Sequence, residues 1–167
     1  MAPDTVCSAD ISCIPTDEGR LYLAALKGLA AMEIVGRSMS ERLESALRED
    51  ALKMAIRNRR SASGLIVHSD RGMQHARDSY SELLGLLNIT ASMSRKVNYL
   101  NNASIKRYFI SLKTEMVHCT NFRTRREARD ALCECIELFY SQQRRHLINR
   151  YRTLAQAGMD MLMKMAV

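Results

Sequence analysis

The stretch Leu65-Ile66-Val67-His68-Ser69-Asp70-Arg71-Gly72 decides the fold that this sequence predicts. Its short apolar run is bounded by polar and turn-forming residues, which is typical of a buried strand. Asp70 then lies at the tip of that strand, and we expect a helix over residues 73–87. An aspartate in this place can serve catalysis, but it can also simply cap a turn near Gly72.

Three short segments upstream predict an antiparallel meander. They cover residues 11–14, 21–26 and 33–38, and they are separated by turn-prone residues 16–19 and by Gly28. The first of them directly follows Asp10. A second carboxylate is therefore expected beside the first strand.

Two capping boxes mark helix starts. Ser38 and Glu41 have the required spacing, so a helix is expected from about residue 39 to 58. Thr124 and Glu127 repeat the spacing and predict the start of a long final helix.

The remaining elements complete an α/β order. Residues 89–93 predict a short strand, and residues 102–116 carry apolar side chains at helical intervals. The expected order β-β-β-α-β-α-β-α-α is that of the ribonuclease H-like fold, a mixed five-stranded sheet with flanking helices, as in retroviral integrases.

The amino-acid composition indicates the number of domains, the class of partner and the cellular compartment. A chain of 167 residues without a Gly/Ser-rich linker suits one domain, and its net charge of +7 favours a polyanionic partner over a merely basic soluble protein. The five cysteines are an odd number, and neither a secretory leader nor an apolar run of about 18 residues is present. We therefore expect a reduced, cytoplasmic protein without a membrane span.

Several different short motifs follow one another in a fixed order along most of the chain. They include Ala9-Asp10-Ile11, Ile34-Val35-Gly36, His68-Ser69-Asp70-Arg71-Gly72, Ser92-Met93-Ser94-Arg95-Lys96 and Arg144-Arg145-His146. In this order they resemble the integrase core of bacterial insertion-sequence transposases of the IS-three type, whose catalytic triad is Asp, Asp, Glu. The resemblance implies an integrase-like core over residues 1–152. The Met-rich residues 153–167 depart from it and are expected to form an irregular or helical tail.

The resemblance also implies the chemistry. Asp10 and Asp70 match the two catalytic, metal-binding aspartates, and Lys106 stands where the family has its catalytic glutamate. Such enzymes cleave and transfer DNA strands with two Mg²⁺ or Mn²⁺ ions. Related transposases also use a helix-turn-helix partner subunit. Because only nine residues precede Asp10, we expect the N-terminal DNA-recognition region to be absent.

Lys106 changes the expected activity. An ammonium group has no acceptor lone pair, so it cannot ligate a metal, and it repels a nearby ion by roughly 4 kcal/mol per unit charge at about 4 Å. Asn102, Ile110 and Lys113 share its helix face, and none is acidic. Glu115 is roughly 13 Å further along the axis and is a poor replacement.

Other departures from the family pattern favour decay of the site. Cys7, Arg20 and Arg37 stand where the family usually has tryptophan, and Cys13 and His75 where it has tyrosine. Each change requires a single nucleotide substitution. We interpret the set as drift in an unselected copy.

Basic side chains are candidates for contacts with DNA phosphates, which give salt-dependent and sequence-blind affinity. A solvated basic face is the alternative for each cluster. The candidates, the last two of which we place at the end of the final helix, are Arg95, Lys96, Lys113, Arg144 and Arg145.

Three hypotheses about function follow. The first is a transposase catalytic core that is inactive because Lys106 replaces glutamate. The second is a non-catalytic module that binds DNA or dimerises. The third is a residual metal-dependent nuclease that uses Asp10 and Asp70. A homo-oligomer is compatible with all three.

Overall fold

The computed structural model describes residues 6–59, 64–69, 77–93, 100–137, 145–146 and 152–153. Its central sheet has five strands in the order β3-β2-β1-β4-β5. They are β1 (Val6–Thr16), β2 (Gly19–Gly28), β3 (Ile34–Ser40), β4 (Ile66–Ser69) and β5 (Thr90–Met93). The first three pair antiparallel, whereas β4 and β5 run parallel to β1, so the sheet is mixed as expected.

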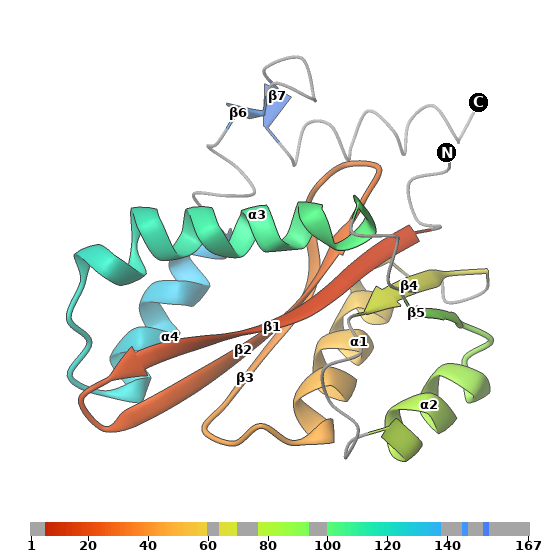
Figure 1. Cartoon of the computed structure of the whole chain (residues 1–167), viewed down its shortest axis with the longest axis horizontal. Helices are drawn as coiled ribbons and strands as arrows, with labels where there is room; N and C mark the ends of the chain where they lie inside the picture. Colours follow the sequence, from red (N-terminus) through yellow and green to blue (C-terminus); the bar gives the residue numbers. More distant parts are fainter. Residues whose placement is uncertain are drawn as a thin grey trace.

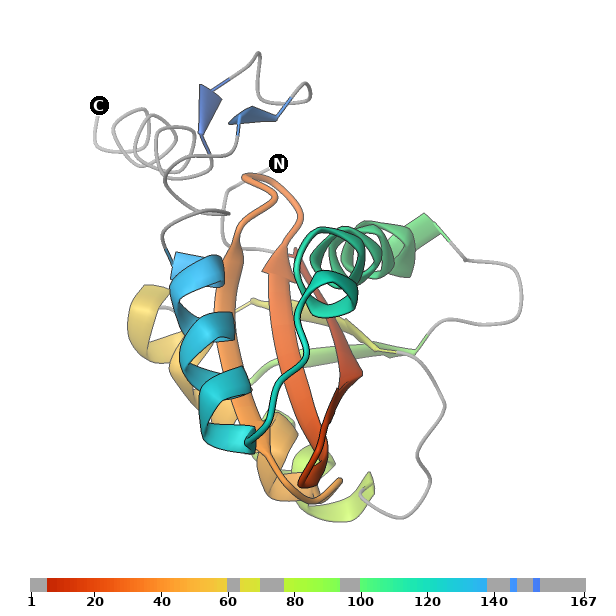
Figure 2. The ribbon, with the colours of Figure 1, turned by 90° about the vertical axis from the view of Figure 1, so that its left-hand side faces the viewer.

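Helices cover both faces of this sheet (Figure 1). Helix α3 (Leu100–Glu115) and helix α4 (Arg125–Glu134) share one buried cluster with β1 and β2. Helices α1 (Ser45–Arg59) and α2 (Arg77–Leu86) enclose a second cluster on the opposite face. The 90° view in Figure 2 shows the strands passing between these helices. The prediction of a ribonuclease H-like α/β fold is confirmed.

The N-terminal strands are longer than the sequence predicted. Strand β1 begins at Val6, so Asp10 lies inside the strand and pairs with Ala25 of β2. The hairpin turns at Gly19, whose φ of +117° is accessible to glycine at little cost. The antiparallel pairing of this meander was predicted correctly.

The first capping box was predicted wrongly. Ser38 stays in β3, where it pairs with Ala24, and α1 begins only at Ser45. The Glu41 carboxylate accepts from Arg125 instead of capping a helix. Strand pairing outweighed the local capping signal because it satisfies the same backbone groups.

The second capping box is confirmed. The Thr124 hydroxyl accepts from the Glu127 backbone N–H at 3.1 Å, and α4 begins at the next residue, Arg125. A π-helical turn over residues 135–137 continues α4. The placement of Arg145 at the end of this helix is wrong, because Arg145–His146 (β6) pairs with Arg152–Thr153 (β7) in a separate two-stranded ladder.

Helix α1 packs very close to β3. A Cβ added at Gly36 would collide with the Ala51 carbonyl oxygen and lie 2.7 Å from the Ala55 Cβ. Glycine is therefore the residue that this contact permits. Within the described residues, no helix is both long enough and apolar enough to span a membrane.

Candidate functional site

Asp10 lies on the face of β1 that is covered by α3. Side chains alternate along a strand, so Ser8, Asp10 and Ile14 share that face. Ile14 is fully buried in the cluster that contains α3, which fixes the direction. The Asp10 carboxylate is half-buried, and its Oδ1 accepts from the Ile11 backbone N–H at 2.8 Å.

Strand β4 ends at Ser69, beside Ala9 of β1. In the parallel ladder Ala9 pairs with Ser69, and each directly precedes an aspartate in the chain. Asp70 itself lies outside the described residues.

Helix α3 is fixed to β1 by a buried hydrogen bond. The Ser8 hydroxyl donates to Asn102 Oδ1 at 3.2 Å, and Asn102 is only 4% exposed. Figure 1 shows α3 running in the same general direction as β1. One helical turn advances about 5.4 Å and two strand residues about 6.7 Å. Lys106 therefore follows Asn102 on the helix much as Asp10 follows Ser8 on the strand.

Lys106 is exposed on this helix face. Its ammonium group can donate hydrogen bonds but cannot ligate a cation. The described residues hold no group of three or more His, Cys, Asp or Glu side chains that could bind a metal. Asp10 supplies carboxylate oxygens that suit Mg²⁺, but the donors described here do not fit a complete two-metal site.

A buried lysine on the Asp10 face was missed by the sequence analysis. Lys27 of β2 pairs with Ser8, is 8% exposed, and donates from Nζ to the Ser104 carbonyl oxygen at 3.2 Å. His68 of β4 also pairs with Ser8, and its buried Nδ1 has no hydrogen-bond partner among the described residues. A lysine within an otherwise apolar strand was the signal that could have revealed this polar cluster.

The predicted phosphate contacts are described only in part. Lys113 lies half-buried in the last turn of α3, while Arg107 is exposed beside Lys106. Arg145 is described as part of β6, without its side chain. Arg95, Lys96 and Arg144 lie outside the described residues.

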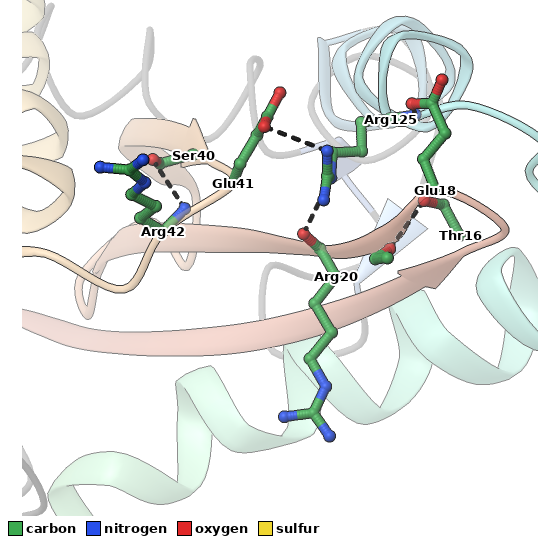
Figure 3. A network of polar contacts seen from close by, with 8 residues as sticks. Thr16, Glu18, Arg20, Ser40, Glu41, Arg42 and Arg125 are labelled. Carbon is green, nitrogen blue, oxygen red and sulfur yellow. Dashed lines mark hydrogen bonds and ion pairs between the residues drawn. The ribbon is translucent and has the colours of Figure 1, made fainter.

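A polar network at the far end of the β1–β2 hairpin is structural (Figure 3). Arg125 donates from Nη1 to Glu41 Oε2 at 3.0 Å, from Nε to the Arg20 carbonyl oxygen at 3.3 Å, and from its backbone N–H to Glu18 Oε2 at 2.9 Å. The Arg20 side chain points away from the network. Arg125 thus ties the start of α4 to the hairpin and to the end of β3.

Two of the residues that we interpret as replacements of tryptophan have defined surroundings in the fold. Cys7 is buried in the α1–α2 cluster. Arg37 forms an ion pair with Glu137. Burial lowers the pKa of Arg37, but hydrogen bonds to Glu137 and Cys133 raise it by more, so the net shift is upward. Both positions therefore have packing or ionic contacts in this fold.

The strand order, with Asp10 on β1 and α3 across it, defines a ribonuclease H-like core of the integrase class. Two family models, both described as integrase core domain, match residues 1–98 and 106–156. The chain belongs to the integrase core domain family.

Curated relatives of the chain come from bacterial insertion sequences. The 31 kDa protein of insertion element IS600 from Shigella sonnei is 41% identical, over 87% of this chain and 53% of its own length. The IS904 transposase of Lactococcus lactis is 37% identical, over 87% and 57%. Transposase InsF of IS3 from Escherichia coli is 38% identical, over 86% and 50%. The chain spans about half the length of these relatives.

Solved structures with the same fold include chains of viral integrase assemblies. A chain of the simian T-cell lymphotropic virus intasome, in complex with PP2A regulatory subunit B56 gamma, superposes with a TM-score of 0.69 at 16% identity, over 93% of this chain and 54% of that chain. The HTLV-2 integrase catalytic core with magnesium, in its dimeric form, gives 0.63 at 14% identity, over 95% and 97%. These likenesses establish the fold.

Proposed function

We propose that this chain is the catalytic core of an insertion-sequence transposase whose DNA cleavage and strand transfer are disabled by Lys106. The relatives named as transposases supply the reaction class. DNA is then the substrate, Mg²⁺ or Mn²⁺ the intended cofactor, and Asp10 and Asp70 its carboxylate ligands. A helix-turn-helix transposase subunit is a candidate partner. The dimeric and trimeric forms of the HTLV-2 core support self-association as a further part of the proposal.

The observation that carries the proposal is the buried Ser8–Asn102 hydrogen bond. It fixes the position of α3 on the sheet face that holds Asp10, and residue 106 follows one helical turn after Asn102. A glutamate there would add a second negative carboxylate for a divalent ion. Lysine adds a positive charge, which favours phosphate and opposes the metal.

Metal-dependent stability tests this proposal directly. Binding that is selective for the folded state raises the melting temperature by mass action. We would titrate Mg²⁺ into the original chain, Lys106→Glu and a matched control, Lys113→Glu, which makes the same charge change two turns further along α3. The expected result is stabilisation of Lys106→Glu alone.

Three outcomes would contradict the proposal. Equal stabilisation of the original chain would show that Lys106 does not disable metal binding. Equal stabilisation of Lys113→Glu would reduce the effect to net charge. The absence of cooperative melting in all three proteins would show that there is no folded core for Lys106 to disable.

A second candidate function is a non-catalytic DNA-binding module. It is favoured by the net charge of +7 and by Lys106 and Arg107, which are exposed side by side on α3. This function predicts retention of a mixed-sequence duplex without added metal and with a steep dependence on salt. Failure to retain the duplex at low salt would exclude it.

A further inference from the structure

A cavity of about 320 Å³ lies on the sheet face opposite α3, between α1 and α2. Its floor consists of three cross-strand pairs of β1 and β2. These pairs are Cys13 with Tyr22, Ile11 with Ala24, and Ala9 with Leu26. The cavity is hollow because alanines and a cysteine provide little side-chain volume.

Two charged residues line the cavity, Arg48 on its wall and Asp10 on β1, and the rest of the floor is mainly apolar. Arg48 of α1 and Tyr80 of α2 both line the space, and they lie close enough to interact electrostatically. Arg48 is half-buried and has no ion-pair partner among the described residues. Burial raises the pKa of Tyr80 to about 12, so its phenol remains a neutral hydrogen-bond donor at physiological pH.

We propose that this cavity is a binding site for a small aromatic or aliphatic carboxylate. The apolar body of the ligand lies over Ala24 and Ile11, and its carboxylate pairs with the Arg48 guanidinium. A volume of about 300 Å³ is at the lower end of the range for small-molecule pockets, so the ligand is of one- or two-ring size. Guanidinium and carboxylate form strong charge-assisted hydrogen bonds.

The site borders Asp10 and Ser69, which also contribute to the cavity lining, but most of its floor lies on the other face of the sheet. Because side chains alternate along β1, those of Ala9, Ile11 and Cys13 face the cavity from the side opposite the Asp10 side chain. The proposal therefore does not depend on transposase activity, and its failure would leave that function untouched.

Thiol protection provides a direct test, with 2-naphthoate as the probe. Cys13 lines the cavity, whereas Cys119 is exposed elsewhere and serves as an internal control. In the full chain, 2-naphthoate should slow alkylation of Cys13 by N-ethylmaleimide, measured by mass spectrometry, and leave Cys119 unaffected. The neutral analogue 2-naphthamide should require an about tenfold or higher concentration, because it lacks the charge.

Variants distinguish the contribution of the Arg48 charge from that of the cavity volume. Arg48→Met keeps an aliphatic stem and should weaken protection about tenfold or more. Arg57→Met removes the same charge from an exposed position of α1 and should change it less than about twofold. Cys13→Tyr should fill the cavity, and loss of 2-naphthoate binding by calorimetry would report this independently.

Several results would overturn the proposal. One is the absence of protection at millimolar 2-naphthoate, and another is equal protection by the neutral amide. Undiminished protection in Arg48→Met would exclude the ion pair. A Cys13 thiol that is inert in the free protein would show that the chain itself already fills the space.

Discussion

Ser8 of β1 and Asn102 of α3 share a buried hydrogen bond of 3.2 Å, which joins the strand that carries Asp10 to the helix that carries Lys106. Both residues are almost fully enclosed, with exposed fractions of 0% and 4%. A buried polar contact of this kind fixes a single register, because either partner left alone would be buried without a hydrogen bond.

The first prediction concerns the strength of this contact. Ser8→Ala and Asn102→Ala should each lower the free energy of unfolding by about 1–3 kcal/mol, because each leaves a buried polar group unpaired. The double variant should lose less than the sum of the two, with a coupling energy of about 1 kcal/mol. Urea unfolding at constant pH measures all three. Strict additivity would show that the two side chains do not interact.

The second prediction concerns the close approach of α1 to β3. Gly36→Ala should destabilise the protein by about 1–3 kcal/mol or more, because its new methyl group meets the Ala51 carbonyl and Ala55. Gly85→Ala is the matched control, since a Cβ there has no neighbour within 4 Å. Because Gly85 is helical, its substitution should stabilise by up to about 1 kcal/mol. Thermal melting would show shifts of opposite sign, and equal shifts would contradict the packing described here.

These predictions also show what the sequence could and could not establish. The strand that ends before Asp70 and the Thr124–Glu127 box were foreseen because their signals are local. The helix predicted to start after Ser38 was wrong, because a capping pattern carries no information about the strand pairing of Ser38 with Ala24. The hydrogen bond that fixes α3 to β1 could not be predicted, because Ser8 and Asn102 are far apart in the chain and only the structure gives their distance. Neither the cavity nor the inward direction of Lys27 could be derived from periodicity alone.

The third prediction concerns the Arg125 network. Arg125→Ala should lower the free energy of unfolding by about 1–3 kcal/mol, because its guanidinium bridges the Glu41 carboxylate and the Arg20 carbonyl. Arg126→Ala is the control on the same helix turn. The Arg126 side chain is 91% exposed and lies 3.9 Å from Asp130, so its removal should cost little. Equal losses in chemical denaturation would show that Arg125 acts only as a surface charge.

The fourth prediction follows from the buried phenol of Tyr80. Its pKa of about 12 lies above the ordinary value of 10, so the folded state holds the proton more tightly than the unfolded state. The corresponding stability is complete below about pH 10 and is lost as pH rises toward 12. Its full size is about 3 kcal/mol.

Tyr80→Phe isolates that contribution from other groups that titrate in alkali. The decline in unfolding free energy between pH 9 and about 11.5 should be shallower in Tyr80→Phe than in the original chain. Parallel declines would indicate a phenol that titrates normally, and absorbance of tyrosinate near 295 nm would check this independently.

The last prediction addresses how α3 meets nucleic acid. If the exposed Lys106 contacts a phosphate, Lys106→Gln should reduce the slope of log affinity against log salt by about one unit, without altering sequence preference. Lys53→Gln removes the same charge from α1, on the other side of the sheet, where Lys53 lies 3.7 Å from both Glu49 and Asp50. Fluorescence anisotropy on a mixed-sequence duplex over a salt series measures both slopes. A reduced slope in Lys106→Gln alone would place the DNA backbone along α3, beside the Asp10 face. Equal slopes in all three proteins would instead place the DNA backbone on another surface, and Lys106 would then make no contribution to DNA binding.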